Sequence, residues 1–219
     1  MNTEDITRAL RLEPTGASEQ GPGRRRNPQL GPKPPPYRFR PFQQGHLDPL
    51  CGVYAMINAL RLLTRPSDGL DAYFWEGLFC HALARADRMF GVRRMLDDGT
   101  PQWLSRALLP VVVKRFETGT GIGVRTLTLT ELAAGMPASD HWDLLQRELE
   151  HRTASALVLL GGAYHHWTVV RSVTAGAVWL FDSDGLKSIV RAEIAPSYRQ
   201  QGHRRYVVSP GPIRVLTRS

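Results

Sequence analysis

The stretch that decides the fold is residues 44–52, which read Gln-Gly-His-Leu-Asp-Pro-Leu-Cys-Gly. The pair Asp48-Pro49 is a common start of a helix. From Cys51 to Leu63, apolar residues then recur at helical spacing. The pattern therefore predicts a helix that begins at Cys51, so that the thiol lies where a loop turns into the helix.

A thiol at the start of a helix can act as a nucleophile. Thiols attack carbonyl groups only as thiolates, and the partial positive charge of a helix N-terminus stabilises that anion. Gly52 lets a substrate and the backbone approach each other closely at this point. The alternative for Cys51 is a buried structural cysteine, which is the commonest state of a free cysteine. Its role therefore depends on whether the chain supplies catalytic partners.

Two later segments supply the other groups that cysteine catalysis needs. Residues 164–170 read Tyr-His-His-Trp-Thr-Val-Val, and residues 181–185 read Phe-Asp-Ser-Asp-Gly. An imidazole takes the proton from the thiol, and a carboxylate holds the imidazole by its other nitrogen. Alternation along a strand puts His165 and His166 on opposite faces, and it does not decide which of them faces the thiol.

The expected strands bring the imidazole and the carboxylate together. Apolar runs predict strands over 166–173 and 177–181, joined by a turn at 174–176. An antiparallel hairpin of this length returns Asp182 to the side of His166. The alternative for Asp182 is an ordinary residue of the turn that follows.

Acyl transfer also needs hydrogen-bond donors for the oxyanion. A side-chain amide and the backbone N–H of the nucleophile can supply them. Gln44 lies seven positions before Cys51, and the loop between them could fold it back. Gln43 is the rival donor, and Gln44 is preferred because a glycine follows it; an exposed loop glutamine is the plain alternative. Four neighbouring residues are predicted to line the substrate cleft: Gly52, Tyr164, His165 and Trp167.

The first half of the chain predicts helices and the second half predicts strands. Further helices are expected over about 70–89, 102–114 and 139–151, with Pro110 kinking or ending the second of these. Further strands are expected over 124–129, 156–160, 187–191, 205–208 and 213–216. This segregation predicts an α+β fold and argues against a regularly alternating one.

Residues 1–36 are predicted to be a disordered tail, and the folded domain is expected over 37–219. The tail is rich in Gly, Pro and Arg and ends in Gly-Pro-Lys-Pro-Pro-Pro over 31–36. Such a segment buries too little apolar surface to offset the entropy lost on ordering. It reads as a plain tail, with a ligand for a proline-binding domain as the alternative.

The basic charge of the chain has two readings. The formal net charge is +8, and the basic residues concentrate in the tail around 24–26 and in the C-terminal stretch 199–218. Both clusters could meet an anionic partner, including a nucleic acid. No nucleic-acid-binding motif accompanies the charge, which favours an ordinary solvated surface.

Two features predict a cytoplasmic protein: the small number of cysteines, and the lack of a signal region or of a membrane-spanning run. The two cysteines, Cys51 and Cys80, fit a reducing compartment better than a disulfide scaffold, and Cys80 is expected in the core or on a half-buried helix face. The chain starts without an apolar signal region and has no run of membrane-spanning length; export by a route without such a signal stays open.

No cofactor or metal is expected. The pair His165-His166 invites a metal, but no Cys/His/Asp/Glu set has the spacing of a structural zinc site. Asp182 and Asp184 invite calcium, but the remaining loop ligands are missing.

The set Gln44, Cys51-Gly52, 166–170 and Asp182 resembles the papain-like cysteine peptidase superfamily, most closely its bacteriocin-processing branch. The resemblance implies that Cys51 is the nucleophile, that Gln44 helps to form the oxyanion hole and that Asp182 orients the imidazole. His166 is favoured as the base because the family histidine precedes an aromatic, valine-rich strand. The implied architecture is a helical N-terminal subdomain whose nucleophile helix packs on a C-terminal antiparallel sheet.

The resemblance implies a bacterial thiol hydrolase that cleaves an amide, peptide or isopeptide bond through an acyl-enzyme. Its substrate would be a protein or peptide, with a ubiquitin-like conjugate as a narrower version. The chain departs from the family in having Val53 where relatives often have Pro or Ser, and it lacks the ATP-binding and membrane regions of exporter-fused peptidases. The alternatives are a transglutaminase, deamidase or acyltransferase with the same residues, or a catalytically inactive adaptor whose basic tail binds an anionic partner.

Overall fold

The computed structural model describes residues 39–45, 49–134, 141–151 and 153–219. The predicted tail over 1–36 and the first two residues of the helix predicted over 139–151 lie outside these residues. The helices are α2 (Cys51–Leu62), α3 (Ala72–Phe90), α4 (Val92–Asp98), α5 (Gln102–Thr120), α6 (Leu129–Leu132) and α7 (His141–His151). The strands are β1 (Val124–Thr128), β2 (Ala154–Gly162), β3 (His166–Val173), β4 (Ala177–Leu180), β5 (Ser188–Val190), β6 (Ile194–Ala195), β7 (Tyr206–Val207) and β8 (Arg214–Arg218).

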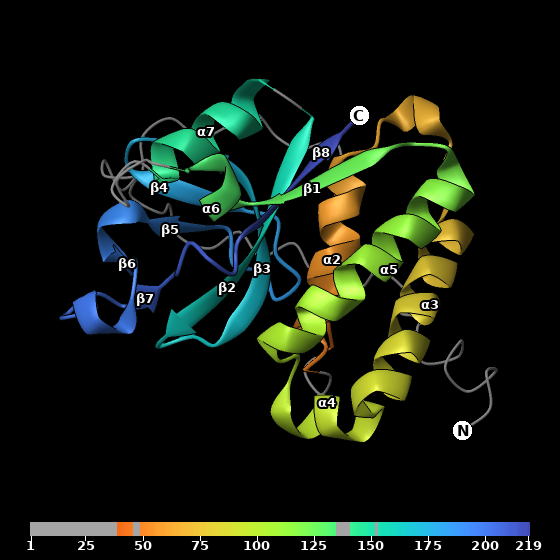
Figure 1. Cartoon of the computed structure of the whole chain (residues 1–219), viewed down its shortest axis with the longest axis horizontal. Helices are drawn as coiled ribbons and strands as arrows, with labels where there is room; N and C mark the ends of the chain where they lie inside the picture. The colour runs from red at the N-terminus through yellow and green to blue at the C-terminus, as the bar shows by residue number, and fades with distance from the viewer. Residues whose placement is uncertain (1–38, 46–48, 135–140, 152) are drawn as a thin grey trace, which may run out of the picture.

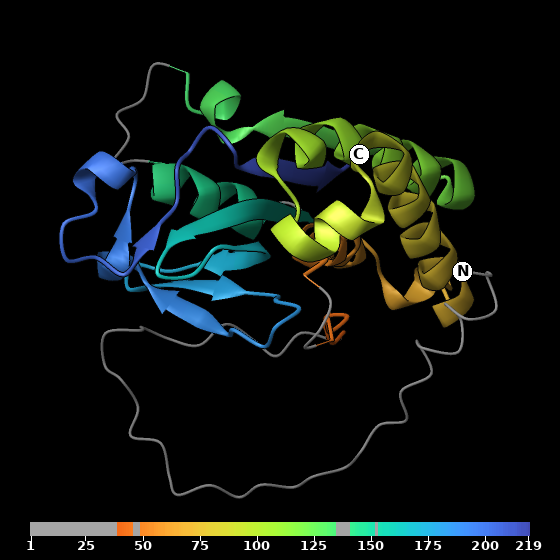
Figure 2. The same ribbon diagram turned by 90° about the horizontal axis from the view of Figure 1, so that it is seen from below.

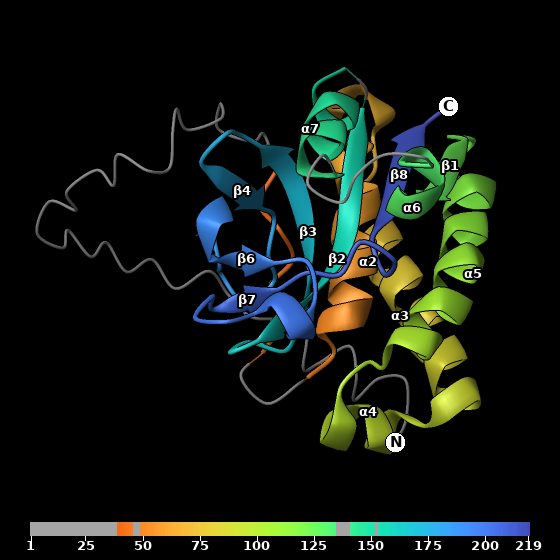
Figure 3. The ribbon, with the colours of Figure 1, turned by 60° about the vertical axis from the view of Figure 1, so that its left-hand side comes forward.

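The strands form one sheet, in which six strands lie in a continuous antiparallel order and two short strands are attached to its side. Its order is β1-β8-β2-β3-β4-β5, and every neighbouring pair along this path is antiparallel. Figure 3 shows β4, β3, β2, β8 and β1 side by side. The short β7 pairs with the end of β2, and β6 joins β7 in parallel. The predicted α+β class with an antiparallel sheet is confirmed.

Helix α2 lies at the centre of the molecule, between the sheet and the other long helices (Figure 1). It packs against β2 and β3, while α3 and α5 cover its outer side. Figure 2 shows the same three layers from another direction, with the orange start of α2 between the blue-green sheet and the yellow-green helices. Every residue of α2 is buried except Arg61, so the helix that carries the candidate nucleophile is held on all sides.

The two faces of the sheet belong to two separate apolar clusters. Leu157 and Val169 pack with the residues of α2, α3 and α5. Val158 and Val170, their neighbours along the strands, pack with Leu145 of α7 on the opposite face. This alternation is what a sheet covered on both faces requires.

Helix α5 differs from the prediction because it runs through Pro110 to Thr120. Pro110 lies on the exposed side of the helix. The residues around it on the inner side stay buried, namely Leu108, Leu109, Val112, Val113 and Phe116. Continued burial of this stripe offsets the one backbone hydrogen bond that a proline removes.

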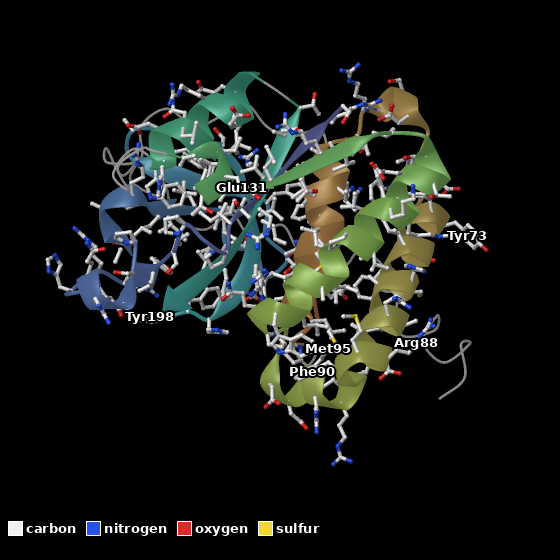
Figure 4. All side chains as sticks on the ribbon, in the orientation of Figure 1. Tyr73, Arg88, Phe90, Met95, Glu131 and Tyr198 are labelled. Carbon is white, nitrogen blue, oxygen red and sulfur yellow. The ribbon has the colours of Figure 1, made fainter. Side chains whose placement is uncertain are left out.

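Three short elements, α4, α6 and β6, are not predicted by the sequence analysis. Helix α4 follows Gly91, and the side chain of Asp87 accepts a hydrogen bond from the first N–H of the helix, at Val92. Its inner residue, Met95, is fully buried beneath α3 and α5 (Figure 4). One buried residue is too weak a pattern to predict a helix. Within the described ranges, no helix is both long and apolar enough to span a bilayer.

Candidate active site

Cys51 is the first residue of α2, as the sequence predicts. The residue is 9% exposed. The residue before it, Leu50, provides no side-chain cap for the helix. The backbone carbonyl of Leu50 accepts from Val53 and Tyr54, whereas the N–H groups of Cys51 and Gly52 donate to no described residue. The thiol therefore lies beside two backbone N–H groups of the helix start that no described residue occupies, and such groups can bind an anion.

His166 is the first residue of β3 and links Cys51 to Asp182. Its Nε2 atom lies 2.8 Å from Oδ2 of Asp182, in a buried contact. The Cys51 side chain lies close enough to the ring to raise the pKa of His166, and Nδ1 is the ring nitrogen that Asp182 leaves available. His166 is buried and His165 is exposed. The three side chains predicted to form a Cys–His–Asp set are thus brought together.

The protonation of this set follows from its surroundings. Burial alone would lower the pKa of His166, but hydrogen bonds to Asp182 and Cys51 and the negative charge of both outweigh it, and the pKa is raised to about 9. Burial alone would raise the pKa of Asp182, but its hydrogen bond to His166 and the charge of the imidazolium hold it below its usual range. At neutral pH the imidazole is therefore a cation beside the ionised carboxylate of Asp182.

Asp182 is fixed by the hairpin and by the loop that follows. Residue Phe181 donates its N–H to the carbonyl of Val169, which continues the β3–β4 pairing up to the carboxylate. While Oδ2 of Asp182 contacts His166, Oδ1 accepts from the N–H groups of Asp184 at 2.8 Å and Leu186 at 3.1 Å. With both oxygens held, the carboxylate is preorganised to orient the ring.

Gln44 lies beside the carboxylate loop. Its N–H donates to the carbonyl of Ser183 at 3.0 Å, and its Oε1 accepts from the Ser183 hydroxyl at 3.2 Å. The side-chain amide of Gln43 instead donates to the carbonyls of Asp182 and Pro41. Among the described residues, none accepts from the amide nitrogen of Gln44. Of the two glutamines, Gln44 is therefore the one whose amide N–H groups donate to no described residue, which makes it the better candidate donor to an oxyanion.

Two residues that the sequence did not single out hold the Gln44 segment in place. Ser183 provides the contacts described above. Asn58, fully buried in α2, accepts from the N–H of Phe42 at 2.8 Å and donates to its carbonyl at 3.1 Å. A polar residue inside an otherwise apolar helix was the signal that could have revealed this anchor.

Two residues predicted to line the cleft, Gly52 and Trp167, are packed in the interior instead. A Cβ atom on Gly52 would lie 2.5 Å from Cβ of Thr100, so the glycine allows close packing of Thr100 rather than of a substrate. Trp167 is 2% exposed, and its indole N–H donates to the carbonyl of Thr100 at 2.7 Å. Thr100 is itself buried. Because Gly52 and Trp167 both pack against it, both are part of the packed interior.

Tyr164 and His165 lie next to the imidazole with different exposure. The ring of Tyr164 is half-buried, with its centroid 5.1 Å from that of His166, and its hydroxyl donates to Oδ2 of Asp184. Burial first, and then the charges of Asp184 and its neighbours, raise the pKa of Tyr164, so the phenol stays protonated. His165 faces solvent.

Cys80 is exposed on α3, which corrects the expectation of a buried or half-buried position. Both cysteines are free thiols. In the described part of the chain, no group of three or more His, Cys, Asp or Glu side chains could hold a metal ion.

Comparisons of this chain with protein-family models, with curated proteins and with solved structures find no match in any of the three. The functional argument therefore depends on the geometry of the site itself.

Proposed function

We propose that this protein is a cysteine-dependent hydrolase of the papain-like type, which cleaves an amide, peptide or isopeptide bond through an acyl-enzyme. The observation that carries the proposal is the meeting of three side chains: His166 lies next to Cys51 and hydrogen-bonds to the carboxylate of Asp182. A thiol at a helix N-terminus, a histidine at the start of a strand and a carboxylate after the next strand are the parts that this chemistry needs.

The first half of the reaction forms a thioester. The Cys51 sulfur, as a thiolate paired with protonated His166, attacks the carbonyl carbon of the substrate. The carbonyl oxygen becomes an oxyanion, which accepts hydrogen bonds from the backbone N–H of Cys51 and from the Gln44 amide. His166 then gives its proton to the leaving amine, the carbon–nitrogen bond breaks and an acyl-enzyme remains.

The second half returns the enzyme to its starting state. Neutral His166 accepts a proton from water while the water oxygen attacks the thioester carbon. Collapse of the second tetrahedral intermediate breaks the carbon–sulfur bond, releases the carboxylic acid and restores the thiolate–imidazolium pair. Asp182 keeps the imidazole in one orientation through both halves and stabilises its positive charge.

The architecture supports the same assignment. The central helix α2 presents the thiol at its start, and the antiparallel sheet presents the imidazole and the carboxylate on neighbouring strands. Papain-like enzymes divide the catalytic groups between a helix and a sheet in this way. Protein or peptide substrates follow from the proposed family.

The proposal is tested with a peptide library prepared from a digested bacterial proteome. The wild-type protein and Cys51→Ala are incubated with the library in water enriched in oxygen-18, and the products are read by mass spectrometry. We expect new C-termini carrying the heavy oxygen with the wild type only. Products that instead carry an added amine would reassign the protein to the transferases, and cleavage that survives Cys51→Ala would refute the nucleophile.

A further inference from the structure

We propose that Asp184 and Tyr164 form a subsite for a positively charged side chain of the substrate, beside His166. The inference rests on the proposed function and adds the chemical class of the substrate: a chain with a lysine, an arginine or another cation close to the bond that is cleaved.

Asp184 is an exposed carboxylate that is held in a fixed position. Its own N–H donates to Oδ1 of Asp182 at 2.8 Å, and its Oδ2 accepts the hydroxyl hydrogen of Tyr164. The first contact ties its backbone to the residue that orients the catalytic imidazole. The second fixes the carboxylate itself, because the phenol is held by packing against His166. Asp184 is thus an anchored charge two residues from Asp182, whereas most surface carboxylates move freely.

The charge of Asp184 is uncompensated within the described part of the chain. The negative charge of Asp182 is matched by protonated His166. Two other aspartates of this basic chain do pair with arginines: Asp143 with Arg191 at 3.0 Å and Asp68 with Arg218 at 2.6 Å. Asp184 pairs with no described cation, and its second oxygen accepts from no described donor.

Tyr164 supports a cation in a second way. Its phenol remains protonated, because burial and the surrounding negative groups oppose its ionisation. It therefore acts as a hydrogen-bond donor to Asp184. Its half-buried ring also offers a face on which a guanidinium or ammonium group can rest.

The subsite lies beside the residue that protonates the leaving amine. His166 is the group that protonates the departing amine, and Tyr164 packs directly against its ring. A cation bound by Asp184 would therefore lie close to the leaving amine. An acidic side chain at the same place would be repelled by the Asp184 carboxylate.

The test uses Cys51 as a reporter of the local charge, so that it needs no known substrate. In a Cys80→Ser background, the rate of Cys51 modification is measured with cationic trimethylammonioethyl methanethiosulfonate and with anionic sulfonatoethyl methanethiosulfonate. Each reagent transfers its thioalkyl group to the sulfur as a mixed disulfide and releases methanesulfinate. The two reagents therefore react in the same way and differ in their charge. We expect the cationic reagent to react faster with the wild type.

Asp184→Asn is the decisive variant. It should lower the ratio of the cationic to the anionic rate by about two- to fivefold, the range of an exposed ion pair, and Asp184→Lys should lower it further. Asp97→Asn on α4 changes the net charge equally and is the matched control, which should leave the ratio unchanged. Added salt should weaken the wild-type preference.

The outcomes separate this inference from the proposed function. If Cys51 reacts readily at neutral pH but the ratio is the same in Asp184→Asn and wild type, the subsite is wrong and the hydrolase proposal stands. If Cys51 reacts with neither reagent at neutral pH, both fail. Peptide pairs that differ only in Lys, Gln or Glu near the cleaved bond should then repeat the preference for Lys in the wild type and lose it in Asp184→Asn.

Discussion

The indole N–H of Trp167 donates to the backbone carbonyl of Thr100 across 2.7 Å, in a fully buried contact. Trp167 follows His166 in the chain, and the Thr100 side chain lies against Gly52, which follows Cys51. The loop before α5 therefore joins the residue after the candidate base to the residue after the candidate nucleophile. Because both neighbours are fixed to one loop residue, the distance between sulfur and imidazole depends on Thr100.

Trp167→Phe removes this hydrogen bond and leaves the Thr100 carbonyl unsatisfied. We expect it to destabilise the fold by about 1–3 kcal/mol and to reduce the rate of Cys51 alkylation at neutral pH. Ser155→Ala is the matched control: the Ser155 hydroxyl donates to the carbonyl of Ala59 at 2.9 Å, another buried link between the sheet and α2. It should lower the melting temperature without changing thiol reactivity. Equal loss of reactivity in the two variants would mean that Trp167 contributes stability alone.

Gly52→Ala should be destabilising, because its Cβ would lie 2.5 Å from both Cβ and Cγ2 of Thr100. An overpacked contact of this kind costs about 1–3 kcal/mol. Combining it with Thr100→Gly removes the atoms that clash, so the double variant should be more stable than the sum of the single effects predicts. Thermal or urea unfolding of the four proteins measures the coupling, and strict additivity would contradict the packing described here.

The two adjacent histidines should behave differently. His166→Ala should lower turnover by about two to four orders of magnitude, because it removes the general base. His165→Ala should retain most of the activity, since its side chain faces solvent and the ring of His166 holds the contacts to Asp182 and Cys51. Turnover of both variants on the same peptide substrate makes the comparison. The opposite ranking would transfer the role of base to His165.

The stability of the protein should fall as the pH rises above neutral. The pKa of His166 is raised to about 9 in the folded protein, against about 6.5 in an unfolded chain. Its contribution is therefore complete below about pH 6.5 and is lost as the pH rises through 9. Asp182 has a lowered pKa, so its contribution is present above its unfolded value near 3.9 and is lost in acid.

Melting temperatures between pH 5 and pH 10 check this dependence. The decline between about 6.5 and 9 should be present in the wild type and much smaller in His166→Gln, whose side chain does not titrate. A decline of the same size in both proteins would show that other groups produce it.

The sequence was sufficient to predict much of the fold because its turns and apolar runs are local signals. The predicted strand over 166–173 coincides with β3, and the turn that follows it fixes the hairpin. Asp182 reaches His166 for that reason alone. Helix α2 was likewise predicted to within one residue, since its apolar spacing is almost uninterrupted.

Contacts between residues far apart in the chain could not be predicted from the sequence. Alternation puts His165 and His166 on opposite faces but cannot say which face is covered, so burial in the folded molecule distinguishes them. Thr100 is far from both Gly52 and Trp167 in the chain, and nothing in its neighbourhood indicates their meeting. Trp167 was expected to line a cleft because aromatic residues beside a catalytic group often do; its packing under α2 overrides that pattern.

The measurement that tests the central claim most directly is the pH dependence of Cys51 alkylation by iodoacetamide in a Cys80→Ser background, with and without His166→Ala. An ordinary thiol loses roughly two orders of magnitude in rate between pH 8 and pH 6, as its thiolate disappears. Because protonated His166 pairs with the sulfur, we predict that the rate changes little over this range and that His166→Ala restores the ordinary dependence. An ordinary dependence in the protein with His166 intact, unchanged by the substitution, would contradict the account.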